Sequence, residues 1–372
     1  MKIGYLITYL GKRGAQSNCL YLAKEVAKKH DVTLFSSYTD DVDLGNVKLV
    51  KCKSLFKYKY YFVFNPGVFK ILRYNLDVLH VHSFGFFFND LLVILLKLFT
   101  KTKIVNTPHG PFMALSEYKW YERILKILFE SFEYFVNKLY DVVIQVNKEQ
   151  YKWMITKGVD KKKIKYVPNG IPESFLKNVE VDSFIEKYGL KNKFIISYLG
   201  GINRYKGMDQ VIKVLPNLLK IKKNIVFLIG GKDFGDRKRL EKIVKRLKLE
   251  KNVLFLGEID DVEHRQLYQV SEIFVLPSDW EAFGIVLLEA MAKNTAVIST
   301  RTEGGKFVVK EGENGCLFDY GNLKELETKF KVLFNDKLRE KIKKNNFKKA
   351  NEFTWEKVGK DLEKIYLKWK SV

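Results

Sequence analysis

Seven residues separate two glutamates, Glu281 and Glu289, in a segment that runs from an apolar stretch into a helical one. A carboxylate accepts several hydrogen bonds, so such a pair suits the vicinal hydroxyls of sugar and ribose rings. The helix is expected to begin near Gly284, where free backbone N–H groups and the helix dipole favour an anion. This spacing predicts a site for a sugar beside a phosphate, with a surface glutamate pair as the alternative.

A second anion-binding loop is expected at Gly200–Gly207, which follows a predicted strand and opens a predicted helix. Glycine allows the backbone to approach a ligand closely. Arg204 and Lys206 add positive charge that suits a diphosphate. The alternative is a glycine turn that carries two solvated bases.

The first half of the chain offers two further candidates, each placed after a predicted strand. Gly11 and Gly14 flank two basic residues, and the backbone of this loop is suited to approach a donor phosphate or an acceptor. His109 follows the strand predicted at 103–106. A neutral imidazole there would donate to a sugar hydroxyl, whereas an imidazolium would steady phosphate charge. A histidine that only caps a turn is the alternative.

Metal and dinucleotide chemistry are not expected. His80 and His82 share one face of a strand, but no third ligand accompanies them, so strand-end packing or hydrogen bonding is favoured. Asp41 and Asp43 imitate an Asp-x-Asp metal motif, but they stand in a polar, turn-like stretch. The first strand is not followed by Gly-x-Gly-x-x-Gly, which disfavours a dehydrogenase. We expect no metal and no cofactor.

The elements that position these residues follow one pattern along most of the chain. Short β-branched runs alternate with amphipathic helical runs, as in doubly wound parallel sheets. In the first half, strands are predicted at 3–8, 31–35, 77–82, 103–106, 141–146 and 163–167. Pro168–Pro172 breaks the alternation, which then restarts with strands at 194–199, 225–229, 253–255, 273–276 and 296–299.

The sequence thus predicts an α/β protein with two Rossmann-like, doubly wound parallel-sheet domains that face each other across a cleft. Ligands bind beyond the carboxyl ends of parallel strands, so the chemistry is expected in that cleft. The expected domains are 1–172 and 173–352. A C-terminal helix at 353–372 is expected to pack back on the first domain.

The chain has 372 residues and a formal charge of +23, which indicates an anionic partner: a phosphate-bearing ligand, an anionic membrane face or nucleic acid. A lysine-rich solvated surface is the alternative. Polar residues interrupt the apolar run at 84–99, and the N-terminus lacks the layout of a signal peptide. The three cysteines are widely spaced. We therefore expect a reduced, cytoplasmic protein.

Two segments mix aromatic residues with lysine, at 56–64 and in the helix predicted at 117–139. One interpretation is contact with a membrane face or a lipid-linked acceptor, where aromatic rings lie at the interface and lysine meets lipid phosphates. The other is an ordinary set of apolar anchors and a core-facing helix. A peripheral position on the inner face of the cell membrane is therefore a hypothesis.

The segment Pro277–Ala292 reads Pro-Ser-x-x-Glu-x-Phe-Gly-x-x-x-x-Glu-Ala-Met-Ala. It resembles the signature of the family 4 glycosyltransferases, which have the GT-B fold. Further motifs of that family are matched in the same order along almost the whole chain, at Thr107–Gly110, Val167–Ile171, Leu199–Asp209, Gly304–Gly305 and Asn314–Gly315.

The resemblance implies a retaining, metal-independent transfer of a hexose from a nucleotide-diphosphate sugar to an acceptor hydroxyl. Lys206 would grip the diphosphate, and Gly284 and Ile285 would add backbone contacts to it. Glu281 and Phe283 would hold the donor sugar, and Glu289 would bind the ribose. His109 would reach the reacting sugar, so His109 and Glu281 are the expected catalytic residues. We expect a UDP- or GDP-hexose donor and a glycan or lipid-linked acceptor.

Two departures from the family pattern bear on function. Gly201 stands where the family has a basic residue, and Arg204 is the candidate to replace it. Asn294 and Ala296 replace the usual Gly and Pro, which we expect to be structural changes only. A non-catalytic nucleotide-sugar-binding subunit therefore remains an alternative function. A basic nucleic-acid-binding protein is a weaker one, because no recognised binding motif accompanies the charge, and we expect no nucleic-acid partner.

Overall fold

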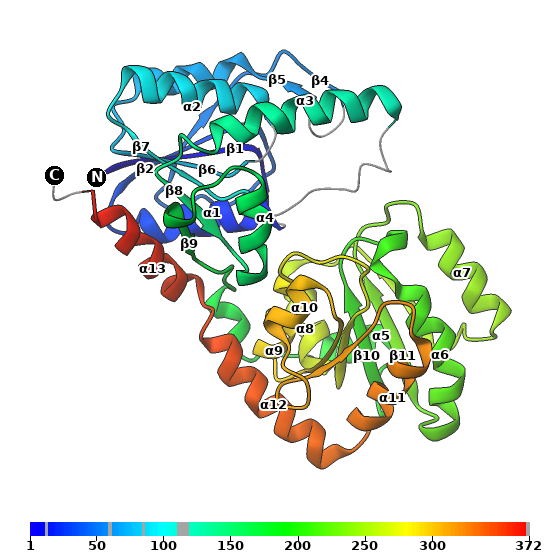
Figure 1. The fold of residues 1–372 in the computed structure, drawn as a ribbon. Coiled ribbons are helices and arrows are strands. Elements are labelled where there is room, and N and C mark those ends of the chain that lie inside the picture. The colour runs from blue at the N-terminus through cyan, green and yellow to red at the C-terminus, as the bar shows by residue number, and fades with distance from the viewer. Residues whose placement is uncertain (12–13, 59–61, 84–85, 110–118, 370–372) are drawn as a thin grey trace. The chain divides into compact units, whose positions relative to one another are not determined.

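The computed structural model describes residues 1–11, 14–58, 62–83, 86–109 and 119–369 (Figure 1). By residue contacts the chain divides into two compact units. The first comprises Met1–Gly170 together with the residues from Trp355 onward, and the second comprises Ile171–Thr354. Each unit is built around its own parallel sheet.

The sheet of the first unit has the strand order β3-β2-β1-β6-β7-β8-β9, and its neighbouring strands are parallel. The order reverses between β1 and β6, which is the switch point of a doubly wound sheet. The strand bounds are Lys2–Leu10 for β1, Asp31–Thr39 for β2, Lys48–Lys51 for β3, Val78–Val81 for β6, Lys103–Asn106 for β7, Val142–Gln145 for β8 and Ile164–Tyr166 for β9.

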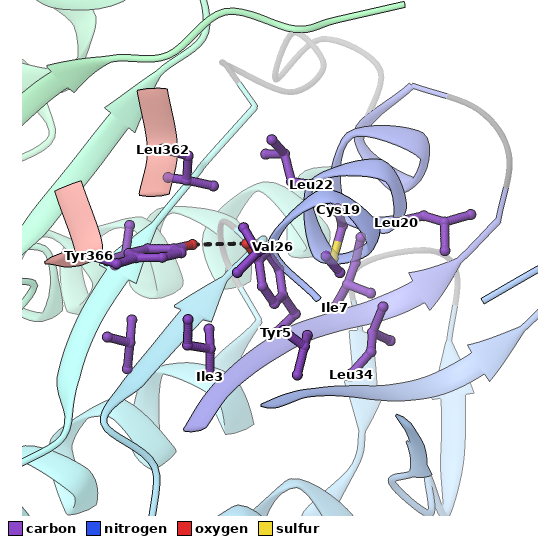
Figure 2. Close-up of a cluster of buried hydrophobic side chains, with 14 of the residues drawn as sticks. Ile3, Tyr5, Ile7, Cys19, Leu20, Leu22, Val26, Leu34, Leu362 and Tyr366 are labelled. Atoms are coloured by element: carbon purple, nitrogen blue, oxygen red, sulfur yellow. Dashed lines mark hydrogen bonds between the residues drawn. The ribbon is translucent and has the colours of Figure 1, made fainter. Parts of the chain in front are cut away.

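Both faces of this sheet are buried. Alternate residues of a strand point to opposite faces, so Tyr5 of β1 joins one hydrophobic cluster and Leu6 joins the other. The Tyr5 cluster includes side chains from α1 and α13, among them Tyr366, whose hydroxyl shares a hydrogen bond of 3.0 Å with that of Tyr5 (Figure 2). The helices are α1 at Ala15–Val26, α2 at Phe87–Phe99, α3 at Trp120–Val136, α4 at Tyr151–Thr156 and α13 at Trp355–Leu367.

The described part of the first unit also contains several short segments. A short antiparallel hairpin is formed by β4 (Phe56–Tyr58) and β5 (Phe62–Phe64), followed by a 3-10 helix at Pro66–Arg73. Further 3-10 turns lie at Lys148–Gln150 and Lys161–Lys163. Among the described residues, no helix is both long enough and apolar enough to cross a membrane.

The sheet of the second unit has the parallel strand order β12-β11-β10-β13-β14-β15, with its switch point between β10 and β13. The strands are β10 at Phe194–Leu199, β11 at Ile225–Gly230, β12 at Val253–Gly257, β13 at Ile273–Leu276, β14 at Ala296–Thr300 and β15 at Cys316–Phe318. The helices are α5 at Asp182–Tyr188, α6 at Met208–Ile221, α7 at Arg237–Arg246, α8 at Asp261–Val270, α9 at Ile285–Ala292, α10 at Glu303–Val308, α11 at Leu323–Leu333 and α12 at Asp336–Asn351.

The prediction of two doubly wound parallel-sheet domains is confirmed, although two strands of these sheets, β3 and β15, were not foreseen, nor was the β4–β5 hairpin. β3 is an edge strand that begins and ends with an exposed lysine, and β15 has only three residues, so neither carries a strong apolar pattern. Asn294 takes a left-handed φ of 55°, a conformation that Asn tolerates better than most residues with a Cβ.

Candidate active site

The loops after β10 and β13 lie against each other at the switch point of the second sheet. Gly207 has a φ of 70°, and a Cβ there would overlap the carbonyl oxygen of Pro277. The backbone N–H of Asp279 donates to the carbonyl of Tyr205 at 2.7 Å. Gln210 also donates to the Pro277 carbonyl, at 3.1 Å. Glycine at 207 is therefore what lets these two loops meet.

This meeting places Lys206 against Glu281, with their charged atoms 2.8 Å apart. The two side chains are only 16% and 19% exposed. Burial disfavours the Lys206 ammonium, but the Glu281 carboxylate outweighs that cost and keeps the pKa of Lys206 above its usual value. The structure thus places a lysine ammonium beside a carboxylate, a group that can accept hydrogen bonds from hydroxyls.

Glu289 lies on α9, and the same oxygen of its carboxylate receives two hydrogen bonds from α8. The Tyr268 hydroxyl donates to it at 3.0 Å, and His264 Nε2 lies 3.1 Å from it. Its other oxygen has no partner among the residues that the structure describes and remains able to accept hydroxyls. Phe175 packs edge-on against His264, with ring centroids 5.2 Å apart.

His264 and Tyr268 were missed by the sequence reasoning. Their spacing of four residues puts them on one face of α8, which is the signal that was present in the sequence. That they face Glu289, however, depends on how α8 and α9 pack, and the spacing does not reveal it.

The start of α9 has the geometry expected of an anion-binding helix end. Gly284 precedes the helix with a φ of 77°, and Ile285 is the first helical residue. The first N–H groups of any helix lack an intrahelical acceptor. Phe283 is buried against Phe307, and the backbone N–H of Gly304 donates to the Glu281 carbonyl at 2.8 Å. The loop that carries Glu281 is therefore held from both sides.

Gly201, which stands where the family has a basic residue, lies against the ring of Phe234. A Cβ on Gly201 would lie 2.8 Å from a ring carbon of Phe234, so a larger side chain at 201 would require that ring to move. Arg204 lies in the same 3-10 turn as Lys206 and is exposed. Within the described chain, its guanidinium forms no ion pair.

In the first unit, three histidines gather at the carboxyl ends of β6 and β7: His80 lies within β6, His82 directly follows it, and His109 follows β7. His82 Nδ1 lies 3.0 Å from His109 Nε2, which is hydrogen-bonding distance. His80 contacts the Tyr366 hydroxyl at 2.6 Å through Nδ1 and the Thr107 hydroxyl at 2.7 Å through Nε2. The prediction that His80 and His82 serve packing and hydrogen bonding agrees with these contacts.

Burial keeps these histidines neutral. It lowers the pKa of His80 to about 3 and holds the pKa values of His82 and His109 below the usual value as well. His109 itself is partly exposed and has a left-handed φ of 59°. Of the two roles that the sequence left open, a neutral ring favours hydrogen bonding to a sugar hydroxyl over charge pairing with phosphate.

The other candidates of the first unit are placed as follows. Gly14 has a φ of 55° and precedes α1, and a Cβ on Gly11 would overlap the Gln16 side chain. The two bases between these glycines lie outside the described residues, as do 59–61, 84–85 and 110–118. Asp43 pairs with Lys24 at 2.5 Å. No group of three or more potential metal ligands occurs in the part of the chain that the structure describes.

Two sequence profiles match successive parts of the chain. "Glycosyltransferase Family 4" matches residues 12–175, and "Glycosyl transferases group 1" matches residues 180–349. Together with the two doubly wound sheets and the charged loops at the switch point of the second, these matches define a glycosyltransferase of the GT-B class. The chain belongs to the family 4 glycosyltransferases.

Individual proteins agree with this assignment. An uncharacterized glycosyltransferase of Methanocaldococcus jannaschii is 25% identical, over 98% of this chain and 96% of its own length. Sucrose-phosphate synthase of Thermosynechococcus elongatus has a TM-score of 0.83 at 18% identity, covering 100% of this chain and 99% of its own. HepE of Anabaena, solved with UDP and glucose, has a TM-score of 0.78 at 18% identity, covering 98% and 99%. At such identities the structural likeness concerns the fold.

Proposed function

We propose that this glycosyltransferase moves a hexose from a UDP- or GDP-hexose to a hydroxyl of a glycan or lipid-linked acceptor, with retention and without a metal. The observation that carries the proposal is the partly buried pair of Lys206 and Glu281 beside the start of α9. A cation, helix N–H groups and a carboxylate meet there, which are the groups that a sugar diphosphate requires.

Negative charge develops on the diphosphate as the glycosidic bond breaks. In the proposed mechanism Lys206 stabilises it, with Arg204 and the N–H groups at Gly284 and Ile285. Glu281 holds donor-sugar hydroxyls, and the unpaired oxygen of Glu289 accepts from the ribose. In the absence of donor, the ion pair with Glu281 holds the Lys206 side chain in the position from which it would contact the diphosphate.

His109 acts on the reacting sugar as a neutral hydrogen-bond donor in this proposal. Its Nε2 is engaged by His82, so Nδ1 is the nitrogen left for the substrate. The sugar becomes oxocarbenium-like, and no carboxylate stands out as a covalent nucleophile. Attack from the face that the leaving group departs from is therefore favoured, which gives retention.

Relatives with named roles support a sugar-polymer context for the acceptor. The capsular polysaccharide biosynthesis glycosyltransferase CapM of Staphylococcus aureus is 30% identical over 49% of this chain and 48% of its own length. The O-antigen biosynthesis glycosyltransferase WclY of Escherichia coli is 27% identical over 81% of this chain and 80% of its own. We propose that the present chain acts in the cytoplasm, at the inner membrane face.

A panel of nucleotide sugars tests this function in two stages. A preferred donor should raise the melting temperature by mass action, and the same donor should then be consumed when glycan or lipid-linked acceptors are added. Product analysis by NMR reports whether the anomeric configuration is retained. Absence of any donor that both stabilises the protein and is turned over would defeat the proposal.

One observation favours a second candidate, a non-catalytic nucleotide-sugar-binding subunit. Phe234 covers the position where the family carries a base. Among the described residues, the Arg204 guanidinium forms no ion pair that would fix it in the site. Such a subunit would be stabilised by a nucleotide sugar yet release no nucleotide with any acceptor. Nucleotide release by the wild type in the presence of an acceptor distinguishes the cases, and in an enzyme Arg204→Ala should lower turnover more than donor binding.

A further inference from the structure

The helix α3 is amphipathic in the opposite sense from an ordinary surface helix. It buries two carboxyl side chains, Glu122 and Glu133, which are 0% and 2% exposed. Its exposed face carries eight large apolar side chains: Trp120, Tyr121, Ile124, Leu125, Ile127, Leu128, Tyr134 and Phe135. A helix in a soluble domain turns its apolar stripe inward, so this arrangement needs a partner outside the domain.

The apolar surface continues from α3 onto its neighbours. The Tyr58 hydroxyl of the β4–β5 hairpin donates to Glu122 at 3.2 Å, and Phe56 stacks on Phe64 at 5.2 Å between ring centroids. Phe87 of α2 contacts the Phe129 and Phe132 rings of α3. Figure 1 shows α2, α3 and the hairpin on the same side of the first unit. We call this surface the aromatic face; its exposed members beyond α3 are Leu55, Phe56, Tyr58, Phe64, Phe87, Leu98 and Phe99.

Lysines lie among these rings rather than apart from them. Lys138 Nζ lies 4.8 Å from the ring centre of Tyr134, and Lys119 Nζ lies 5.9 Å from that of Tyr121. Lys53, Lys57 and Lys101 are exposed beside the hairpin and the end of α2. Aromatic rings with ammonium groups close to them match a bilayer interface, where rings enter the headgroup layer and lysines meet lipid phosphates.

We propose that the aromatic face docks this enzyme on an anionic lipid bilayer. The charge of the chain, +23, complements such a surface, whereas a second copy of the chain would bring like charges together. The inference extends the proposed function by naming the surface that meets the membrane. Its test requires no turnover, so it stands or fails separately from the donor site.

Vesicle sedimentation of the full chain tests this directly. The double variant Ile124→Ser/Leu128→Ser removes two side chains that are 51% and 60% exposed, so the fold should be unaffected. The matched control is Ile221→Ser/Val332→Ser, at 56% and 40% exposure in the second unit. Wild type and control should bind vesicles of phosphatidylglycerol and phosphatidylcholine in equal parts. The double variant should bind about tenfold more weakly or worse.

Two further arms decide what covers the face. Binding should fall with added salt and be weak on vesicles of phosphatidylcholine alone, because lipid phosphates attract the lysines. The proposal would be overturned if wild type does not bind the anionic vesicles, or if the double variant binds them as tightly as wild type does. Light scattering compares the oligomeric states of the two proteins. If wild type is an oligomer and the double variant is a monomer, while both bind vesicles equally well, the face is a protein interface.

Discussion

The carboxyl ends of the two parallel sheets carry different chemistry on the same architecture. In the second unit, Lys206 and Glu281 form a partly buried ion pair, and Glu289 lies one turn into the helix that follows. In the first unit, His80, His82 and His109 are neutral and bonded to one another or to hydroxyls. The difference fits the proposed function, in which the charged edge holds the diphosphate and the neutral edge meets the reacting sugar.

The largest effect is expected at the charged edge. Glu281→Gln removes the negative charge that pairs with Lys206 and turns one of the two acceptor oxygens for sugar hydroxyls into a donor, so kcat/KM should fall about 1,000-fold. The measurement is initial-rate transfer with the preferred donor. Glu327→Gln changes a glutamate of similar exposure that pairs with Lys331, and it should leave the rate unchanged. Near-normal turnover of the Glu281 variant would remove that residue from the mechanism.

At the neutral edge, His109→Ala should lower kcat about 100-fold while the donor Kd changes little. The reason is that a neutral donor to the reacting sugar acts on the transition state more than on donor binding. Steady-state rates and calorimetric donor titration provide the two numbers. If kcat of the His109→Ala variant is unchanged, or if only its donor affinity falls, His109 does not act on the transition state and both edges serve binding alone.

The neutral histidines also predict how stability depends on pH. His80 has a folded-state pKa of about 3, below its unfolded value, so the unfolded chain binds more protons between these limits. The contribution of neutral His80 to the free energy of unfolding is therefore fully present above the unfolded pKa of about 6.5, and it is lost as the pH falls toward the folded-state pKa. By pH 5 the loss from His80 is about 2 kcal/mol.

Denaturant unfolding at pH 5 and above the unfolded pKa measures how the free energy of unfolding changes with pH. Trp280→Phe leaves tryptophans only at 120, 153, 355 and 369, so fluorescence then reports on the first unit alone. In that background, His80→Gln should flatten the pH dependence. A slope that survives the substitution would show that other groups carry it.

The smallest effect concerns the bond between the two histidines at the end of the sheet. His82→Phe keeps a ring but removes Nδ1, which fixes His109, so kcat should fall about tenfold with donor Kd unchanged. His82→Asn returns an amide near the Nδ1 position and should restore part of the rate. In the His109→Ala background neither change should matter. Equal losses in both backgrounds would make His82 a packing residue only.

Much of the architecture was predictable because it rests on local patterns. β10 and β13 are fully buried apolar runs, and the strand-loop-helix order around Glu281 and Glu289 follows from the sequence. The prediction failed where a strand was short or exposed, as at β3 and β15. Such segments are held by their neighbours in the sheet rather than by their own pattern.

Contacts between distant elements set the rest of the candidate site, and no spacing encodes them. Tyr366 reaches His80 across most of the chain, and Tyr268 meets Glu289 through the packing of α8 on α9. From the sequence, α3 could be interpreted either as a core-facing helix or as a membrane-facing one. Only the exposed fractions of its side chains decide that it turns its apolar face outward.

Calorimetric titration with a nucleoside diphosphate and its monophosphate tests the central claim most directly, because the two ligands differ only in the phosphate that Lys206 should hold. Wild type should bind the diphosphate about tenfold or more tightly than the monophosphate, and Lys206→Met should bring the two affinities together. A Lys206→Met protein that still prefers the diphosphate to the same degree would contradict the account, because the diphosphate would then be held elsewhere.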